Sequence, residues 1–501
     1  MEPVTALLAT LMACLCLYYF IANTLLYFKR LKIPHVLPIP LLGNLGPFIL
    51  RRISLAEIIC NTYRLFPDAK YFGFYDFTTP IYVLRDLDLI NLITIKNFDH
   101  FCNHRNFVNE NLEPIAGRNL FGLRNDQWRA TRRHLSPTFT SNKIKLMFGL
   151  VCKCAENFAN FIAAEAGSTG KTYNMKDIQC RFANDVVASC AFGIDVDSFN
   201  EPNNEFFLLG QKTMNFNGAL TYKMLISRNF PNLANLLRIK FFESKTENFF
   251  KQIISDSVRF RREKGVVRPD VIHLMMESKD ADGEPLFDVE EMAAQALVFF
   301  LAGFDSISTS MSYLAHEVAI NPDVQNKLLA EIENVLEETN GKPTYETICG
   351  MRYMDAVVSE SMRLHPLVSS LDRVCVKEFE LPPATPDSEP VTLKPGDVVW
   401  FQSYAIHRDS KYYPRPNDFV PERFLNGEVN SSSYMPFGIG PRICIANRFA
   451  LMEMKVMLFH MLQHCIFEPD VKTRIPMILD KKSFMVMADG GFWLRLRARK
   501  Y

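Results

Sequence analysis

The most informative segment of the 501-residue sequence is 437-FGIGPRICIANRFALME-453. Apolar residues at three- and four-residue spacing in its second half predict a helix, and Cys444 stands just before that helix. The N-terminus of a helix offers N–H donors and a positive dipole, and therefore suits a metal-bound thiolate. Gly438 and Gly440 allow a tight backbone that presents the sulfur. Arg442, two residues before the cysteine, is placed to pair with an anionic group.

Taken alone, Cys444 is most simply read as an inert, buried structural cysteine, because such cysteines are common. Phe437, Gly440 and Arg442 stand in register with it, and together they argue against that interpretation. The pattern resembles F-x-x-G-x-R-x-C, the haem-binding loop of the cytochrome P-450 superfamily, with Ala446 where that family most often has glycine. The resemblance implies haem b, the Cys444 thiolate as axial metal ligand, Phe437 over the ring and Arg442 beside it.

Two upstream segments extend the resemblance. Trp128 and Arg132 match W-x-x-x-R, whose tryptophan and arginine reach the haem propionates in the family. A spacing of four places both on one helix face, where an exposed cation–π pair is the alternative. Arg373 matches a further propionate-binding arginine. The resemblance therefore implies that three arginines and one indole N–H bind the two carboxylates.

A third segment, Glu360-Ser361-Met362-Arg363, resembles the E-x-x-R of the family. The spacing of three places Glu360 and Arg363 on one helix face, as an ordinary surface ion pair also would. In the family the arginine of a later segment, here Arg423, joins this pair. A buried trio of charges must be fully paired. The resemblance thus implies that these three residues are structural and hold the haem loop.

The long helix predicted from Val289 contains Ala302-Gly303-Phe304-Asp305-Ser306, which resembles A-G-x-[DE]-T. In that family motif the small residues give oxygen room beside the helix, and an acid and a neighbouring alcohol relay protons. The resemblance implies catalytic roles for Asp305 and Ser306 and a place for Ala302 beside the haem. Serine replaces the usual threonine and lacks the methyl group that restrains its rotamer. Looser coupling of oxygen reduction to product formation is therefore expected. The alternative to a catalytic role for Asp305 and Ser306 is a helix kink or a solvated polar face.

The substrate pocket is only partly predicted. Val298 shares a helix face with Ala302 and Ser306. By resemblance, loops that face the haem carry Val368, Leu371 and Phe484, and the segment 101–121 contains the flexible loop before the next helix. The aromatic-rich segment 206–250 is expected to cover the access channel, to dip into the membrane or to belong to the core. An apolar pocket of this kind suits lipophilic substrates.

The N-terminal segment predicts a membrane anchor. Val4 to Phe28 carry no charge over twenty-five residues, enough to cross a bilayer about 30 Å thick. Lys29, Arg30 and Lys32 follow it directly and favour an uncleaved anchor with the protein body on the cytosolic side. We expect a single-pass anchor over 1–28, a basic and proline-rich hinge over 29–47 and one haem-containing catalytic domain over 48–501. The expected location is the endoplasmic reticulum membrane.

The remainder of the chain predicts a mainly α fold with small β-sheets, in which the haem lies between the long helix and the cysteine loop. Helical periodicity is clearest over 126–135, 143–164, 175–190, 235–262, 289–320, 324–339, 353–364 and 446–464. Strand-like runs cover 70–75, 81–84 and 397–402. The motifs are dispersed from Trp128 to Cys444 and must converge on one ring, which argues against the several independent domains that the length alone suggests.

Composition and missing motifs limit the partners. Fifty-six basic and 55 acidic residues give a formal charge of +1, so no nucleic-acid partner is expected. Residues 167–172 resemble a phosphate-binding loop but lack its first glycine, and no G-x-G-x-x-G occurs. Electrons must therefore come from outside, and the resemblance implies NADPH–cytochrome reductase, with cytochrome b5 as a further candidate. A docking patch is expected at Arg129, Arg133, Lys143 and Lys145, with ordinary solvated helix faces as the alternative.

The resemblance, closest to insect microsomal members of the drug-metabolising clan, implies a monooxygenase. Such an enzyme inserts one atom of O2 into a lipophilic substrate, here expected to be a xenobiotic such as a plant toxin or insecticide. An endogenous lipid or hormone is the alternative substrate. A haem-thiolate isomerase or dehydratase, or a haem-based sensor, is the alternative class. Retention of Asp305 and Ser306 favours the monooxygenase.

Overall fold

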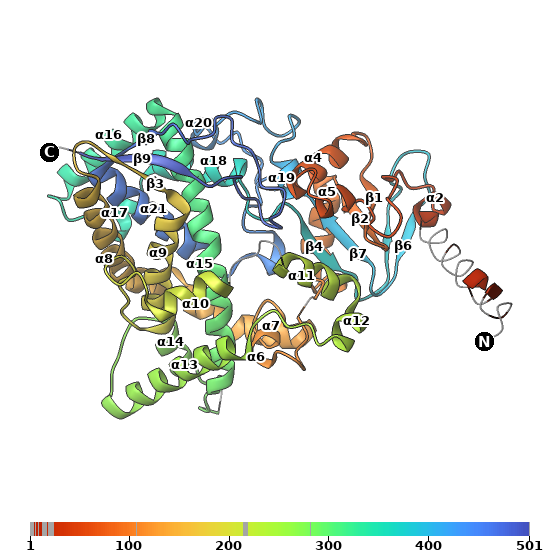
Figure 1. Ribbon diagram of the computed structural model, residues 1–501, viewed down its shortest axis with the longest axis horizontal. Helices are drawn as coiled ribbons and strands as arrows, with labels where there is room; N and C mark the ends of the chain where they lie inside the picture. The colour runs from red at the N-terminus through yellow and green to blue at the C-terminus, as the bar shows by residue number, and fades with distance from the viewer. Residues whose placement is uncertain are drawn as a thin grey trace.

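A computed structural model gives the fold. It describes Thr5, residues 7–8, 10–12, Tyr18, 25–106, 108–213, 219–280 and 282–499. Most of the predicted anchor, Val4–Phe28, lies outside these residues. The expectation of a mainly helical chain with small sheets is confirmed (Figure 1).

The longer helices form the body. They are α4 (Leu55–Arg64), α7 (Asn125–Leu135), α8 (Ser141–Ala166), α9 (Met175–Val187), α10 (Glu205–Thr213), α11 (Ala219–Asn229), α13 (Ser244–Lys264), α15 (Val289–Ile320), α16 (Pro322–Glu338), α18 (Arg352–Leu364) and α21 (Asn447–His464). Short helices connect them: α2 (Tyr27–Arg30), α3 (Gly46–Ile49), α5 (Leu87–Asn91), α6 (Pro114–Gly117), α12 (Pro231–Leu236), α14 (Val271–Met276), α17 (Tyr345–Cys349), α19 (Ser403–Ile406) and α20 (Glu422–Leu425). Tighter or wider turns are η1 (Leu92–Lys96), η2 (Phe98–His100), η3 (Ser136–Phe139), η4 (Ala188–Phe192) and η5 (Gly440–Arg442).

Within the described part of the chain, three small sheets complete the fold. The largest has the order β1-β2-β7-β4 and joins β1 (Tyr71–Asp76), β2 (Thr79–Leu84), β7 (Val398–Phe401) and β4 (Leu371–Val374). β2 and β7 are parallel with Ile81 opposite Val398, and the other pairs are antiparallel. The second sheet joins β3 (Lys171–Asn174), β9 (Trp493–Ala498) and β8 (Cys465–Pro469), and the third pairs β5 (Phe379–Leu381) with β6 (Val391–Leu393). Figure 1 shows the largest sheet at one end of the molecule and the long helices at the other.

Helix α15 runs through the core with the bounds that the sequence predicts. The helix begins with a capping box. The Asp288 side chain accepts a hydrogen bond from the Glu291 N–H, and the Glu291 side chain accepts one from the Asp288 N–H. Its small residues allow close packing: a Cβ added at Gly303 would lie 2.7 Å from Val187 of α9. α15 contacts α9, α13, α18 and α21. The fold thus places the middle of this helix deep inside the protein.

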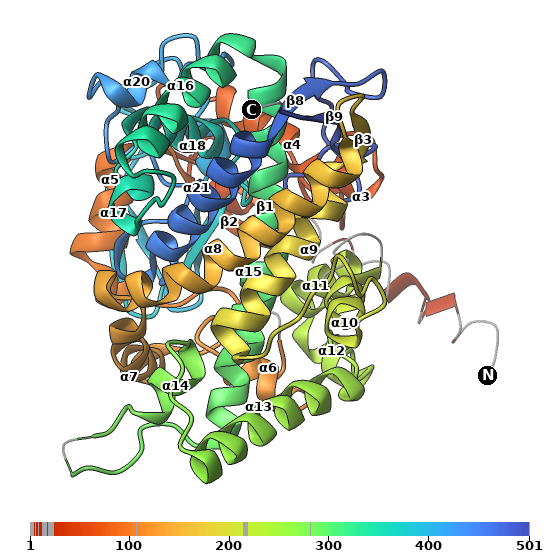
Figure 2. The ribbon, with the colours of Figure 1, turned by 90° about the vertical axis from the view of Figure 1, so that its left-hand side faces the viewer.

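Helix α21 carries the cysteine segment into the core. It lies against α8, and Figure 2 shows the two side by side. Much of α21 is buried, so the loop before it is fixed to a rigid element. Among the described residues, α8 and α15 are long and apolar enough to cross a membrane, but α15 is mostly buried in the helical body and α8 packs against α21 and α9.

The predicted helix over 235–262 is wrong at its start. The structure has a break instead: α12 ends at Leu236, and α13 begins at Ser244. Arg238 adopts a left-handed backbone with φ of 48°, and the buried Glu113 carboxylate accepts hydrogen bonds from the backbone of Phe241 and Phe242. A side chain from a distant segment therefore replaces the helical hydrogen bonds that the periodicity predicts.

Candidate haem site

The cysteine loop is a tight turn that presents one sulfur. The Cys444 N–H donates to the Phe437 carbonyl at 2.9 Å, which closes the loop. Gly440 has φ of +72°, and a Cβ there would lie 2.2 Å from the Thr94 carbonyl oxygen. Only glycine fits that position, because both the backbone conformation and the space exclude a side chain. Phe437 is half-buried beside the turn.

Cys444 is the exposed cysteine among the ten that the structure describes. Its sulfur is nevertheless surrounded by protein, since burial raises the pKa of the thiol. The Ala446 backbone and Arg132 act in the opposite direction. The sequence predicts a thiol at the first turn of the helix with a lowered pKa, and this is not what the structure shows, because α21 begins three residues later, at Asn447. Cys444 is thus accessible to solvent and yet surrounded by protein atoms, so we infer that its sulfur borders an internal space.

Two arginines, the buried Arg373 and the half-buried Arg442, lie around this space and are held by backbone oxygens. Arg442 donates to the carbonyls of Cys102 and Leu123 at 2.8 and 3.0 Å, and its guanidinium lies 4.0 Å above the Trp128 ring. Arg373 donates to the Ile439 carbonyl at 3.0 Å, and its Nε has no partner. The alternative interpretation, an exposed cation–π pair between Trp128 and Arg132, is therefore not what the structure shows. Trp128 is buried, and its cation partner is Arg442.

The charge of this cluster is only partly balanced by one nearby carboxylate, Asp372, which acts to raise the pKa of both Arg442 and Arg373. Burial lowers the pKa of Arg442 to about 9, and repulsion from Arg373 and Arg132 adds to that effect. Burial also lowers the pKa of Arg373 to about 10. Asp372 already binds His104 at 2.9 Å and the Arg105 N–H at 2.6 Å. The excess positive charge and the unpartnered Arg373 N–H suit a group that carries two carboxylates. The adjacent cysteine sulfur suits a metal in the same group, as in haem.

One face of α15 is open where most of the helix is buried. Ala302 is exposed, and Val298 and Ser306, four residues away on either side, are half-buried. The Ser306 hydroxyl donates to the Ala302 carbonyl within the helix. Of the two small residues in the motif, only Ala302 faces open space, because Gly303 packs against α9. The structure places Val298, Ala302 and Ser306 on one face, as the spacing predicts.

The Asp305 carboxylate and the Ser306 hydroxyl have separate hydrogen-bond partners. The Asp305 carboxylate accepts from the Lys176 ammonium of α9 at 2.7 Å, and both side chains are largely buried. The same ammonium reaches the hydroxyls of Ser308 and Thr309 at 2.8 and 2.5 Å. The predicted acid–alcohol pair is therefore divided: the acid points to α9 and the alcohol stays on the open face. The motif carries no signal for Lys176, which lies 129 residues upstream.

The predicted structural trio is assembled. Glu360 accepts from Arg363 Nε at 2.7 Å and from Arg423 Nε at 3.0 Å, and all three side chains are at most 5% exposed. Sequence reasoning missed His407, whose Nδ1 donates to the Arg363 carbonyl and whose Nε2 accepts from the Met435 N–H, both at 3.0 Å. Burial lowers the pKa of His407 to about 3, so it stays neutral and able to accept.

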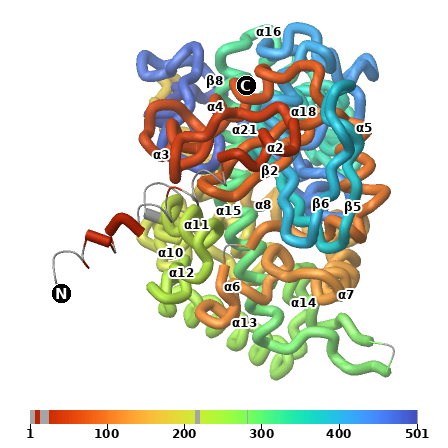
Figure 3. Tube along the Cα trace, turned by 90° about the vertical axis from the view of Figure 1, so that its right-hand side faces the viewer, coloured from red at the N-terminus to blue at the C-terminus, as the bar shows by residue number. Residues whose placement is uncertain are grey.

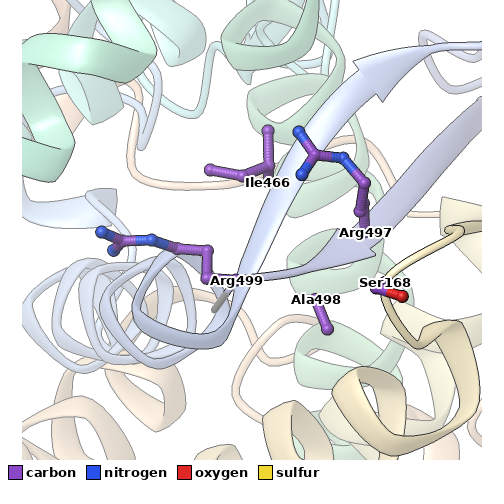
Figure 4. Close-up of a pocket in the computed structure, with 5 residues that line it drawn as sticks. All are labelled: Ser168, Ile466, Arg497, Ala498 and Arg499. Atoms are coloured by element: carbon purple, nitrogen blue, oxygen red, sulfur yellow. The ribbon is translucent and has the colours of Figure 1, made fainter. Parts of the chain in front are cut away.

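The predicted substrate residues occupy separate segments. Leu371 lies in β4 and is half-buried, as is Phe484, whose ring lies 5.7 Å from the guanidinium carbon of Arg228. Val368 is 40% exposed. A distinct surface pocket, lined by residues of the β8–β9 sheet and by Ser168, contains none of the predicted site residues (Figure 4).

The predicted docking patch is partly neutralised. Arg129 pairs with Asp99 at 2.6 Å, and Lys145 pairs with Glu346. Arg133 and Lys143 have no acidic partner among the described residues. Only two of the four predicted cations are therefore unpaired.

Comparisons with known proteins agree with this geometry. A family model described as Cytochrome P450 matches residues 34–495. The chain is similar to cytochrome P450 9e2 of Blattella germanica, with 43% identity over 94% of this chain and 94% of that protein. It is 35% identical to probable cytochrome P450 9f2 of Drosophila melanogaster over 94% of this chain and 95% of that protein. It is 32% identical to cytochrome P450 6k1 of Blattella germanica, over 97% and 95%.

Proposed function

Because this chain belongs to the cytochrome P450 family, and is thus a monooxygenase with haem b on a cysteine thiolate, we propose that it oxidises lipophilic foreign compounds. The proposed substrates are plant toxins and insecticides. The site assignment rests on Cys444, whose sulfur is accessible although protein surrounds it. Arginines whose positive charge is only partly neutralised lie beside it. The similarity to cytochromes P450 9e2 and 6k1 supports the substrate class.

We propose that the Cys444 thiolate would hold the haem iron. Arg132, Arg373, Arg442 and the Trp128 indole would bind the two propionates, and Phe437 would lie beside the ring. Bound haem b supplies the activation of O2, by which one oxygen atom enters the substrate and the other leaves as water. Arg373 and Arg442 are already held by backbone oxygens, so these two donors need little rearrangement when the carboxylates bind. The exposed Ala302 would leave room for oxygen beside α15.

Ser306 and Asp305 are proposed to relay protons to the site of oxygen activation. The Ser306 hydroxyl lies on the open face of α15, where it can hold a proton near the site of oxygen activation. Asp305 must first leave Lys176 to exchange protons with that face, because the ion pair points it toward α9. Val298, Val368, Leu371 and Phe484 are proposed to line an apolar substrate space.

The electrons are proposed to come from NADPH through a partner reductase, with cytochrome b5 as a second donor. Arg133 and Lys143 are the cations of the predicted patch that an acidic partner can still use. Salt would weaken such docking, because exposed charges are screened within about 8 Å at physiological ionic strength. Reversing both charges should slow reduction at low salt more than at high salt.

The catalytic body is proposed to lie on the cytosolic face of the endoplasmic reticulum membrane, held by the anchor over 1–28. Exposed apolar side chains support contact with lipid. Leu236 and Leu237 of the α12 region are 79% and 61% exposed, and Leu37, after the predicted anchor, is 82% exposed. Deleting residues 1–28 should release only part of the protein from the membrane fraction into the soluble fraction, because this apolar surface remains.

The proposed function is tested with the full chain, NADPH–cytochrome reductase and lipid vesicles. A panel of lipophilic toxins and insecticides is incubated with NADPH, and products are identified by mass spectrometry. We expect at least one product with one added oxygen that requires both NADPH and reductase. Product formed without NADPH would indicate an isomerase or dehydratase instead. Turnover of endogenous lipids or hormones alone would overturn the xenobiotic assignment.

A further inference from the structure

Arg408 lacks the partners that a buried guanidinium group normally has. It follows α19, and its guanidinium carbon lies 3.7 Å from the centre of the Tyr404 ring. Its Nη1 is buried and has no hydrogen-bond partner, and no carboxylate of the described residues lies within 4.0 Å of its nitrogens. Burial lowers the pKa of Arg408, so its charge is only weakly offset by the surroundings.

Arg85 shows how this fold stabilises a comparable side chain. Its guanidinium carbon lies 4.1 Å from the centre of the Tyr63 ring, and its Nη1 donates to backbone carbonyls of the segment 66–69. Arg408 has the same stacking on a tyrosine, but no carbonyl takes the place of those acceptors. Stacking alone therefore leaves the N–H groups of Arg408 in need of an acceptor.

Two further hydrogen-bond donors lie near Arg408. Tyr313 of α15 is fully buried, and its hydroxyl has no partner among the described residues. Cys60 of α4 is buried as well. Burial raises the pKa of both groups, and the charge of Arg408 opposes each shift, which places the guanidinium within electrostatic reach of both. A guanidinium, a phenol and a thiol thus gather in one place.

The helices fix this arrangement. α19 contacts α4, α15 contacts α18, and Figures 1 and 3 show α4 and α18 together in the upper half of both views. The Tyr313 ring stacks on His365, just beyond the end of α18, with 4.2 Å between the ring centres. His407, the neighbour of Arg408, binds the Arg363 carbonyl through its Nδ1. The segment that carries Arg408 is therefore held against the end of α18, close to Tyr313.

The acidic side chains on these segments hydrogen-bond to other groups: Glu57 to Ser54, Glu317 to His365 and Asp409 to Tyr63. Glu317 acts on Arg408 only weakly. Burial acts to raise the pKa of Glu317, His365 lowers it most, and Arg408 contributes least. Most of the positive charge of Arg408 is therefore left without a counter-charge.

These properties suit an anion better than a water molecule. The guanidinium group offers only donors, and the phenol and the thiol each have a hydrogen to donate. A buried charge is costly unless it is paired, and an anion supplies the charge that water lacks. Arg408 is half-buried rather than sealed, so an ion has access to it, and the full burial of Tyr313 restricts the ligand to a small one.

We propose that Arg408, Tyr313 and Cys60 bind one small monovalent anion, which in the cell is chloride. The ion accepts from the Arg408 guanidinium and the Tyr313 hydroxyl, and the Cys60 thiol is the third donor. By fixing Arg408, the ion also stabilises the adjacent His407, which binds the Met435 N–H before the cysteine loop. The site is separate from the haem and does not depend on which substrate is oxidised.

The first test locates the ion. Crystals of the full-chain, haem-loaded enzyme are grown in sodium bromide, and diffraction is recorded at the bromine absorption edge. An anomalous peak should lie within about 3.5 Å of the Arg408 nitrogens and of the Tyr313 hydroxyl. Only a water molecule at that place, without an anomalous signal, would overturn the proposal.

The second test measures the effect on stability. The apparent thermal midpoint is followed at one scan rate while chloride replaces gluconate, which is too large for the site, at constant ionic strength. The wild-type midpoint should rise and level off, by about 2 °C when chloride is about ten times its dissociation constant. Arg408→Gln should show no rise, and Tyr313→Phe should need at least about ten times more chloride for half the effect.

Arg85→Gln is the matched control, because it removes an arginine that stacks on a tyrosine but donates to carbonyls. Its midpoint should be lower at every chloride concentration and should respond to chloride as the wild type does. If Arg408→Gln does not fold, Tyr313→Phe still tests the site, since it removes only a hydroxyl without a partner. A wild-type chloride response in either site variant, or its loss in Arg85→Gln, would contradict the anion site.

Discussion

Replacing Glu360 by glutamine should release the haem loop without removing a side chain. The Glu360 carboxylate receives four hydrogen bonds: two from Arg363 at 2.7 and 2.9 Å, one from Arg423 at 3.0 Å and one from the Val420 N–H at 2.8 Å. Glutamine keeps the shape but leaves two buried guanidinium groups without a counter-charge. Breaking a buried ion pair costs about 3–5 kcal/mol. That is a large share of the roughly 5–15 kcal/mol by which a typical domain is stable.

The loss should reach the haem loop through His407. Arg363 donates to the His407 carbonyl at 2.6 Å, and His407 in turn fixes the Met435 N–H, two residues before Phe437. The assay compares the thermal midpoint and the haem content of Glu360→Gln and a control, Asp270→Asn. Asp270 is also fully buried and pairs with Arg261 of α13 at 2.6 Å. Both variants should melt earlier, and only Glu360→Gln should also lose haem. Equal haem retention in the two variants would refute this account of the trio.

Four further predictions follow from the site. Gly440→Ala should abolish haem incorporation, measured by pigment per protein, because its Cβ would meet the Thr94 carbonyl. Full loading would contradict this. Arg373→Leu should speed haem transfer to apomyoglobin, and an unchanged rate would place the propionates elsewhere. Ser306→Thr should lower the peroxide released per NADPH, because its methyl group restrains the hydroxyl; an unaltered ratio would refute this. Burial raises the pKa of Asp185 to about 7, so the folded state binds its proton more tightly than the unfolded state. The stability from Asp185 is present below about pH 4 and lost as the pH rises to about 7, by at most about 4 kcal/mol. Asp185→Asn should therefore gain stability over wild type in urea titrations at pH 8 and not at pH 4.

Periodicity and motif spacing predicted the parts of the site that lie within one element. The bounds of α15 and the shared face of Val298, Ala302 and Ser306 follow from helical geometry, and the structure confirms both. The Glu360–Arg363 pair follows from the same rule. The resemblance added Arg423, which spacing alone could not connect to a helix about sixty residues upstream.

Contacts between distant segments could not be predicted in this way. Lys176 turns Asp305 away from Ser306, and Glu113 interrupts the helix expected from residue 235. In each case one side chain from another part of the chain outweighs a local pattern.

The most direct test of the assignment concerns the sulfur of Cys444. The full chain is purified, reduced with dithionite and exposed to carbon monoxide, beside Cys444→Ser and the matched buried variant Cys465→Ser. Wild type and Cys465→Ser should show the red-shifted Soret band of a thiolate-bound haem, and Cys444→Ser should not. A red-shifted band and intact turnover in Cys444→Ser would contradict the account.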